Sequence, residues 1–115
     1  MIDKSLQTGS TSMLILKLIE TDDMYGYEMI EALAKRSSNV FALKAGTLYP
    51  LLRHLEEQGL VSSYEKEPDS ARVRKYYHLT QSGRKQLEVK KYEWETFSSA
   101  INRVLNGGAG IVAVG

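Results

Sequence analysis

Hydrophobic positions in the first third of the chain recur at helical spacing. From Ser5 to Glu20 they predict a first helix, which ends at a short polar run. A second helix is predicted from Tyr25 to Arg36, and a break of two serines and an asparagine follows it. Residues 40–43 are too few for a helix, so they are interpreted as a brief strand. The residues that we expect the second helix to bury are Tyr27, Ile30, Leu33 and Ala34.

A stripe of leucines predicts a third helix that begins near Gly46 and ends at Gly59, a typical C′ residue. If the helix begins there, Pro50 lies in or just after the first turn, where a missing amide donor costs little. The leucines at spacing i, i+3, i+4 and i+7 are Leu48, Leu51, Leu52 and Leu55. The opposite side carries an unusual mixture for plain solvent exposure: Gly46, Thr47, Tyr49, Pro50, Arg53 and His54.

Two β-prone runs follow, on either side of a proline-initiated turn at residues 68–71, and they predict an antiparallel hairpin. Side chains alternate between the two faces of a strand, so the second run has two distinct faces. We expect one face to pack on the protein: Val73, Lys75, Tyr77 and Leu79. The other face is basic and aromatic: Arg72, Arg74, Tyr76 and His78.

The last helix is predicted from Gln81 to Asn106, with Thr80 as its N-cap and a glycine pair as its terminator. At 1.5 Å per residue it would be roughly 39 Å long, which is longer than a small domain is wide. Its apolar residues follow heptad spacing, with Lys90 in the same seam, so we expect the seam to contact a second subunit. The expected dimer interface consists of Leu87, Trp94, Phe97, Ile101 and Val104.

Length and composition narrow the class of protein. A chain of 115 residues predicts one compact domain. The absence of cysteine excludes disulfides and thiolate metal sites, and with only two histidines we expect neither a metal nor a cofactor. No run approaches the roughly 18 apolar residues of a membrane span, so we expect no membrane association and a cytoplasmic location. The net charge is +1, but residues 72–91 form a basic segment.

The predicted order of helix, helix, short strand, helix and hairpin is that of a winged helix-turn-helix, in which the third helix enters the major groove of DNA. The fold class expected is therefore mainly α with a small β-hairpin, followed by a long C-terminal dimerisation helix. Each residue also has an ordinary interpretation as a cap, a core residue or a solvated surface residue. The residues predicted to contact double-stranded DNA at a promoter operator are Tyr25, Lys44, Thr47, Tyr49, Pro50, Arg53, His54, Arg72, Arg74 and Lys75.

Three segments, "MYGYEMIEAL", "GTLYPLLRHLEEQGLV" and "RKYYHLTQSG", resemble the signature blocks of PadR-type transcriptional regulators, in the same order and spacing. The likeness runs from about Leu6 to Trp94 and is similar to the compact subclass with one helix after the wing. The resemblance implies a homodimeric winged-helix repressor whose last helix forms the dimer and whose DNA affinity responds to a small molecule. The sequence departs from the family at its wing tip, "EPDSAR", which contains no glycine.

The seam of the last helix also suggests an effector site. A gap lined by Trp94, Phe97 and Lys90 would admit a planar aromatic compound, although Trp94 as plain dimer core is the alternative. The expected division is a winged-helix DNA-binding domain at 1–79, a dimerisation helix at 80–106 and a glycine-rich tail at 107–115. No convergent nucleophile, base or metal ligands indicate an enzyme. The rival function is a winged-helix module that binds protein without specific DNA binding.

Overall fold

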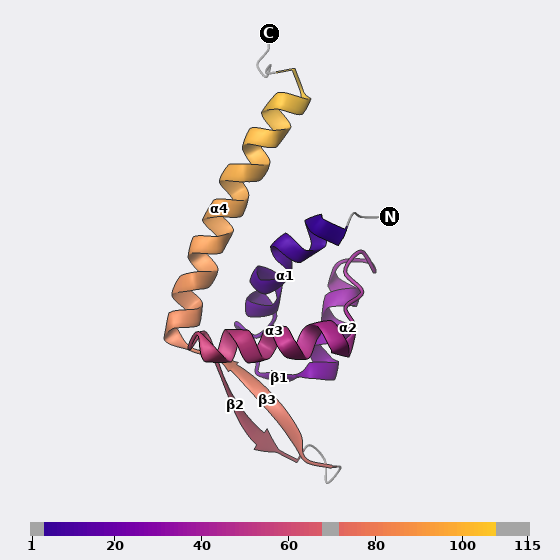
Figure 1. The fold of residues 1–115 in the computed structure, drawn as a ribbon, viewed down its shortest axis with the longest axis vertical. Helices are drawn as coiled ribbons and strands as arrows, with labels where there is room; N and C mark the ends of the chain where they lie inside the picture. The colour runs from indigo at the N-terminus through magenta and orange to yellow at the C-terminus, as the bar shows by residue number, and fades with distance from the viewer. Residues whose placement is uncertain (1–3, 68–71, 108–115) are drawn as a thin grey trace.

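The computed structural model describes residues 4–67 and 72–107, with side chains described from Ser10 onward. Helices α1, α2 and α3 gather above the hairpin of β2 and β3, while α4 extends away from them (Figure 1). The bounds in chain order are α1 Lys4–Leu18, β1 Met24–Tyr25, α2 Gly26–Arg36, α3 Ala45–Glu57, β2 Val61–Lys66, β3 Arg74–Leu79 and α4 Gln81–Leu105. The fold is a winged helix-turn-helix followed by one long helix, as the sequence predicts.

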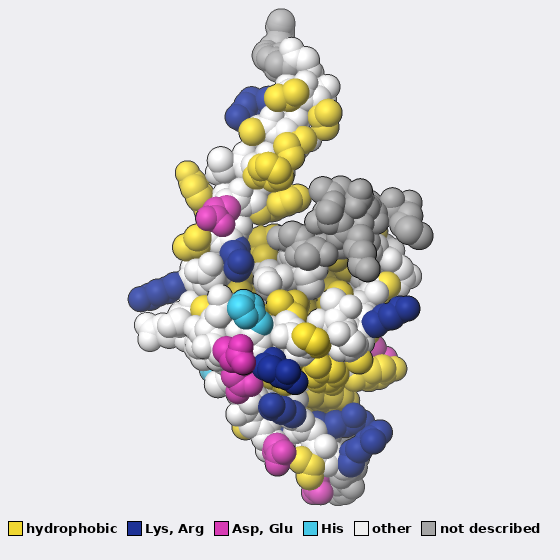
Figure 2. Space-filling view, viewed as in Figure 1, with side chains coloured by type: hydrophobic (Ala, Val, Ile, Leu, Met, Phe, Trp, Pro, Cys, Tyr) yellow, Lys and Arg dark blue, Asp and Glu magenta, His cyan; other side chains and the backbone are white. Residues whose placement is uncertain are grey.

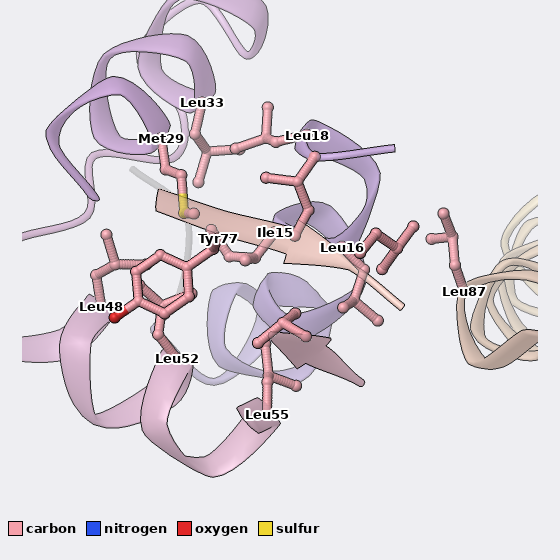
Figure 3. Packing of buried hydrophobic residues seen from close by; sticks show 13 residues of the cluster. Ile15, Leu16, Leu18, Met29, Leu33, Leu48, Leu52, Leu55, Tyr77 and Leu87 are labelled. Atoms are coloured by element: carbon pink, nitrogen blue, oxygen red, sulfur yellow. The ribbon is translucent and has the colours of Figure 1, made fainter. Parts of the chain in front are cut away.

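The core forms where the apolar faces of α1, α2 and α3 meet one face of the sheet. The predicted leucine stripe of α3 is buried at Leu48, Leu52 and Leu55, and Leu51 is partly buried beside it. Figure 3 shows Leu48, Leu52 and Leu55 together with Met29 and Leu33 of α2 and Tyr77 of β3. The residues that α1 adds to this core are Ile15, Leu16 and Leu18, and Ile19 follows directly after the helix. Hydrophobic burial thus fixes α3 with its opposite side turned outward.

Pro50 lies just after the first turn of α3. The helix begins at Ala45 with Lys44 as its N-cap, so Pro50 falls in the second turn. There it removes the amide that would bond the carbonyl of Gly46. Both residues are exposed, so water can solvate that carbonyl in place of the missing donor. Pro50 therefore does not replace one of the unpaired first-turn amides, which was the predicted reason for its small cost; access to water keeps that cost small instead.

The sheet is antiparallel with the order β1-β3-β2, and its third strand is not where the sequence placed it. Residues 41–44 have no regular structure, whereas Met24–Tyr25 pairs with β3 through Met24↔Tyr77 and Tyr25↔Tyr76. The positive φ angles of Ser38 and Asn39 turn the chain after α2. Phe41 then packs partly buried against the core and does not join a sheet edge.

Two faces also differ from their predictions. In α2 the buried residues are Gly26, Met29 and Leu33, whereas Tyr27 is 56% exposed. The packing of α2 against α1 and α3 centres on Met29, so the buried face is rotated from the predicted one. In β3 the predicted packing face is buried only at Tyr77 and Leu79, because the hairpin projects beyond the helices and leaves Val73 and Lys75 exposed. The turn predicted at 68–71 lies outside the described residues.

The end of α3 and the start of α4 form one hydrogen-bonded junction. Gly59, at a φ of 76°, ends α3 as predicted, and the amides of Gly59 and Leu60 donate to the carbonyls of Glu56 and Leu55 at 2.9 and 3.0 Å. Thr80 caps α4 as predicted, because its hydroxyl accepts from the Gly83 amide at 2.9 Å. The same hydroxyl lies 2.7 Å from the Gly59 carbonyl, to which it donates. The two helices therefore share their terminal contacts.

The far end of α4 stops at Gly107, which has a φ of 72° and donates its amide to the Val104 carbonyl at 3.1 Å. This confirms the first glycine of the predicted terminator. The second, Gly108, and the rest of the predicted tail lie outside the described residues. The helix of 25 residues is roughly 37 Å long at 1.5 Å per residue.

Candidate nucleic-acid interface

The outer side of α3 is an exposed ridge opposite the buried leucines. At about 100° per residue the ridge is centred on Gly46, Pro50 and Arg53, and all three are exposed. Thr47 and Lys44 are exposed at the start of the helix, where the Thr47 amide donates to the Lys44 carbonyl at 3.0 Å. The Lys44 side chain makes no capping hydrogen bond, so its charge is available at the N-terminal end of the ridge.

Tyr49 stands on the flank of the ridge and packs partly against α2. Its side chain is 44% exposed, and its hydroxyl and ring lie directly over Gly26. A Cβ at Gly26 would overlap the phenol, with the Tyr49 Cε1 atom only 2.9 Å away. Gly26 thus permits a close approach of α2 and α3, and that approach sets how far Tyr49 projects.

His54 does not lie with Tyr49 on the ridge. The two residues are about 140° apart around the helix axis. His54 lines a polar hollow of about 290 Å³ at the junction of α1, α3 and α4, together with Gln58, Gln86 and Lys90. The structure therefore separates His54 from the predicted reading residues Tyr49 and Arg53.

The hairpin carries a cluster of rings and cations on the sheet face that points away from α3. We call this the outer-face cluster; it consists of Tyr25, Tyr64, Lys66, Arg74 and Tyr76. The Tyr25 ring meets Tyr76 edge-on with centroids 5.3 Å apart, and Tyr64 stacks on Tyr76 at 5.7 Å. The Arg74 guanidinium lies 4.8 Å from the Tyr25 centroid, and the Lys66 ammonium 5.2 Å from that of Tyr76. Because these rings cover it, Tyr76 is only 7% exposed, although the sequence placed it on an open face.

A carboxylate anchors this cluster to the start of β1. Asp23 accepts hydrogen bonds from the Tyr64 hydroxyl at 2.6 Å and engages His78 Nδ1 at 2.9 Å. Partial burial by itself would raise the Asp23 pKa, but the hydrogen bonds from Tyr64 and His78 outweigh it and leave this pKa below its ordinary value. The same hydrogen bond to Asp23 raises the pKa of Tyr64 to about 12. Asp23, Tyr64 and Lys66 were not predicted, because pairing across the hairpin had to be known first.

The hairpin presents cations on both of its faces. Lys75 lies on the sheet face shared with α3, where its ammonium is 5.7 Å from the Tyr77 centroid, and Glu65 pairs with it across the strands. Arg74 and Lys66 pair on the opposite face, and Arg72 is exposed just before β3. Lys and Arg side chains gather over the hairpin at the lower end of the molecule, with Asp and Glu side chains between them (Figure 2).

Most of the predicted dimer seam is exposed along α4, whose apolar side chains are visible in Figure 2. The exposed members are Trp94, Phe97, Ile101 and Val104. Leu87 differs, because it is 0% exposed and belongs to the core of its own chain. The first turns of α4 pack against α1, so Leu87 cannot also face a second subunit. The seam predicted from the sequence therefore begins at Trp94.

Trp94 and Phe97 meet α1 around a hollow of about 370 Å³. Their ring centroids are 6.5 Å apart, and Lys90 lines the same hollow, so the three residues predicted to form an effector site do lie together. Ser10 and Met13 of α1 and Glu93 complete the lining. The sequence offered no signal for the α1 residues, because the packing of α1 on α4 is a tertiary contact.

Residues 4–67 and 72–107 contain neither a cluster of metal ligands nor a membrane-spanning helix. No group of three or more histidine, aspartate or glutamate residues there could hold a metal ion. None of the helices described in these ranges is long and apolar enough to cross a membrane.

Comparison with known proteins identifies the family. Residues 15–89 match the Transcriptional regulator PadR-like family. The chain is 30% identical over 107 residues to "Uncharacterized protein X" of Lysinibacillus sphaericus, and the matched residues cover 93% of this chain and 98% of that protein. A PadR-like transcriptional regulator from Bacillus cereus strain ATCC 14579 shares 31% identity at a TM-score of 0.79, over 89% of this chain and 97% of that one.

A second solved structure, a PadR family transcription regulator from Clostridium difficile R20291, shares 39% identity at a TM-score of 0.72, over 84% of this chain and 98% of that one. Members of the family are transcriptional regulators, not enzymes; they bind DNA and commonly act as dimers. The resemblance found in the three sequence blocks is thereby confirmed. The chain belongs to the PadR-like family of transcriptional regulators.

Proposed function

We propose that this chain is a repressor that binds an inverted repeat in promoter DNA as a homodimer and is released by a small aromatic ligand. The observation that carries the DNA-binding part is the exposed ridge of α3 beside a hairpin with cations on both faces. A helix presenting hydrogen-bonding groups can read base edges, and cations at its flank neutralise phosphates. Residues 1–79 would form the DNA-binding domain and residues 80–106 the dimerisation helix.

The proposed contacts divide into reading and anchoring. Arg53 and Tyr49 face the base edges from the ridge of α3, and Pro50 offers an apolar surface to a thymine methyl group. His54 stays at the edge of this surface, because it lines the polar hollow. The residues proposed to face the sugar-phosphate backbone are Tyr25, Lys44, Thr47, Arg72, Arg74 and Lys75.

The proposed dimer uses the exposed seam of α4. Four large apolar side chains, Trp94, Phe97, Ile101 and Val104, are exposed along one side of this helix. A contiguous apolar stripe of that size marks an interaction surface, and heptad spacing suits pairing with an identical helix. A two-fold dimer presents two copies of α3, so it should prefer two half-sites about one helical turn apart.

The proposed effector site is the hollow at Trp94 and Phe97. Its volume of about 370 Å³ lies within the range of small-molecule pockets, and its two rings offer faces to a planar aromatic compound. Planar phenolic and cationic aromatics can be screened through Trp94, the only tryptophan in the chain. A compound that quenches Trp94 fluorescence should also lower operator affinity. Quenching without any change in operator affinity would show that Trp94 is dimer core only.

Footprinting upstream of the protein's own coding region tests the DNA-binding proposal directly. We expect protection of two symmetric half-sites and, at low salt, weaker binding to random duplex. An asymmetric single half-site would contradict the dimeric reading. No binding to any duplex at low salt would favour the rival function, a protein-interaction module.

A further inference from the structure

The Arg74 guanidinium is held by an aromatic ring and not by an acid. It lies 4.8 Å from the Tyr25 centroid, and among the described residues no ion pair involves it. Its Nε atom is buried and has no hydrogen-bond partner among those residues. A buried donor of this kind is unusual, because most buried polar groups find an acceptor. The Tyr25 ring is therefore the contact that holds this guanidinium, and its Nε–H donor is unused within the described part of the chain.

Tyr25 is itself firmly held. Its backbone pairs with Tyr76 in the sheet, and its amide donates to the Glu28 carboxylate at 3.1 Å at the start of α2. Its ring packs edge-on against Tyr76, which Tyr64 covers from the other side. Asp23 fixes Tyr64 through the hydroxyl. The ring beneath Arg74 thus rests on two further rings and a carboxylate, so it cannot easily move.

We propose that Tyr25 is a positioning residue for DNA binding, whose ring holds the Arg74 guanidinium ready for a backbone phosphate. This inference rests on the proposed function, and it assigns Tyr25 a role through Arg74 in place of a phosphate contact of its own. An arginine stacked on a fixed ring loses less conformational freedom when it binds a phosphate. The phosphate oxygens would then supply acceptors for a guanidinium that makes no ion pair with the described residues.

The position of Arg74 favours the backbone over a base edge. Arg74 lies on the sheet face away from α3, so it points away from the groove floor that α3 would read. Lys66 pairs with it across the hairpin on the same face. Two neighbouring cations repel each other in the free protein, and an anion placed between them relieves that repulsion. A backbone phosphate is the anion that duplex DNA offers.

A double-mutant cycle tests the inference. Affinity for operator and random duplexes is measured by fluorescence anisotropy for Tyr25→Leu, Arg74→Ala and their combination, with Tyr25→Phe as the matched control. We expect Tyr25→Leu to weaken both duplexes about three- to tenfold, the effect of losing a cation–π contact and its preorganisation. Tyr25→Phe keeps the ring and should stay within about twofold of the wild type. In the Arg74→Ala background Tyr25→Leu should cost nothing further.

Several results would overturn the inference. A full additional loss from Tyr25→Leu in the Arg74→Ala background would show that Tyr25 acts independently of Arg74. An equal loss from Tyr25→Phe would show that the phenol touches DNA itself. In either case the wild type still binds the operator, so only the positioning role fails. A wild type that binds neither duplex would overturn the proposed function together with the inference.

A measurement on the wild type keeps the test independent of whether Tyr25→Leu folds. Nuclear magnetic resonance relaxation reports the order of the Arg74 Nε–H group in the free protein. We expect an order parameter near the roughly 0.85 of a rigid backbone, because the Tyr25 ring fixes the side chain. A value below about 0.6 would mean a freely moving guanidinium and would overturn the inference.

Discussion

The Tyr49 side chain lies directly over the Cα atom of Gly26, so the tyrosine of α3 rests on the first residue of α2. Gly26→Ala would place a methyl group inside the phenol. Because Tyr49 is half-exposed, it can swing outward, and we expect a loss of only about 1 kcal/mol in the free energy of unfolding. Operator affinity should fall with it, since Tyr49 leaves its place on the ridge. Thermal unfolding and operator titration measure the two effects.

Gly46→Ala is the matched control for stability. Gly46 is exposed, and apart from its chain neighbours and the backbone of its own helix no atom lies within 4 Å of its Cβ position. Alanine there should raise the free energy of unfolding by roughly 0.5–1 kcal/mol, because a helical glycine costs conformational entropy. If Gly26→Ala behaved like Gly46→Ala in unfolding, the close contact with Tyr49 would not exist in solution.

Gly83→Ala should be more damaging than Gly26→Ala. A Cβ at Gly83 would overlap the backbone carbonyl of Leu60 and come within 2.5 Å of the Leu79 side chain. A backbone carbonyl cannot rotate away as a phenol can, so α4 would have to move. We expect a loss of about 1–3 kcal/mol in urea unfolding, as in other overpacked sites. Unchanged stability would show that the close contact of Gly83 with the Leu60 carbonyl does not exist in solution.

Substitutions of two arginines distinguish base recognition from phosphate binding. Arg53→Ala should lose roughly 1–3 kcal/mol of operator affinity and relax the preference at one position per half-site. Arg74→Ala should weaken operator and random duplexes alike and lower the salt slope by about one. Binding to a panel of single-base operator variants at several salt concentrations distinguishes the two. An equal loss on every sequence from Arg53→Ala would mean that Arg53 contacts only phosphate.

The proposed dimer predicts that substitutions on opposite sides of α4 have different effects on dimer formation. Ile101→Asp would bury a carboxylate in the apolar seam, and the dimer should dissociate while the winged domain stays folded. Tyr92→Asp is the control, because Tyr92 is nine residues away and therefore about 180° around the helix. Sedimentation should show a monomer for the first variant and a dimer for the second. An unchanged dimer in Ile101→Asp would place the interface elsewhere.

The hydrogen bonds of Asp23 predict how stability depends on pH. A group whose folded pKa is lowered stabilises the fold above its unfolded pKa, and this contribution disappears as the pH falls through the folded value. Asp23→Asn should therefore reduce stability at neutral pH and flatten the loss of stability below about pH 4. Ultraviolet titration should also show the Tyr64 pKa return from about 12 toward its ordinary value. Asp22→Asn is the control, since Asp22 is exposed beside the cluster.

The sequence predicted most of the fold because the strongest signals in it are local. The leucine spacing of α3, the glycine at its end and the threonine before α4 each act within a few residues. β1 was missed because a strand of two residues has no periodicity of its own and exists only through its pairing with β3. The buried face of α2 was misplaced because neighbouring helices, and not the helix itself, decide which side is covered.

The candidate site also has a part that the sequence predicts and a part that it does not. The ridge of α3 and the exposed seam of α4 follow from helical spacing, so Arg53 and Trp94 could be placed from the sequence alone. The outer-face cluster could not be, because Tyr25, Tyr64 and Tyr76 come from three strands and meet only through the sheet register. Leu87 illustrates the reverse case, in which correct heptad spacing continues into a region that already packs on its own core.

The junction at Thr80 leaves no hinge between α3 and α4. One hydroxyl contacts Gly59, just after α3, and the first turn of α4, and Gly83 lets α4 lie against the Leu60 carbonyl. In the proposed dimer each chain would then act as a rigid lever, with its arm along α4. A tilt of about 5° over a helix of roughly 37 Å displaces the far end by roughly 3 Å. That is about the rise of one base pair. A small change where two α4 helices cross would therefore move the two α3 helices out of register with their half-sites on the DNA.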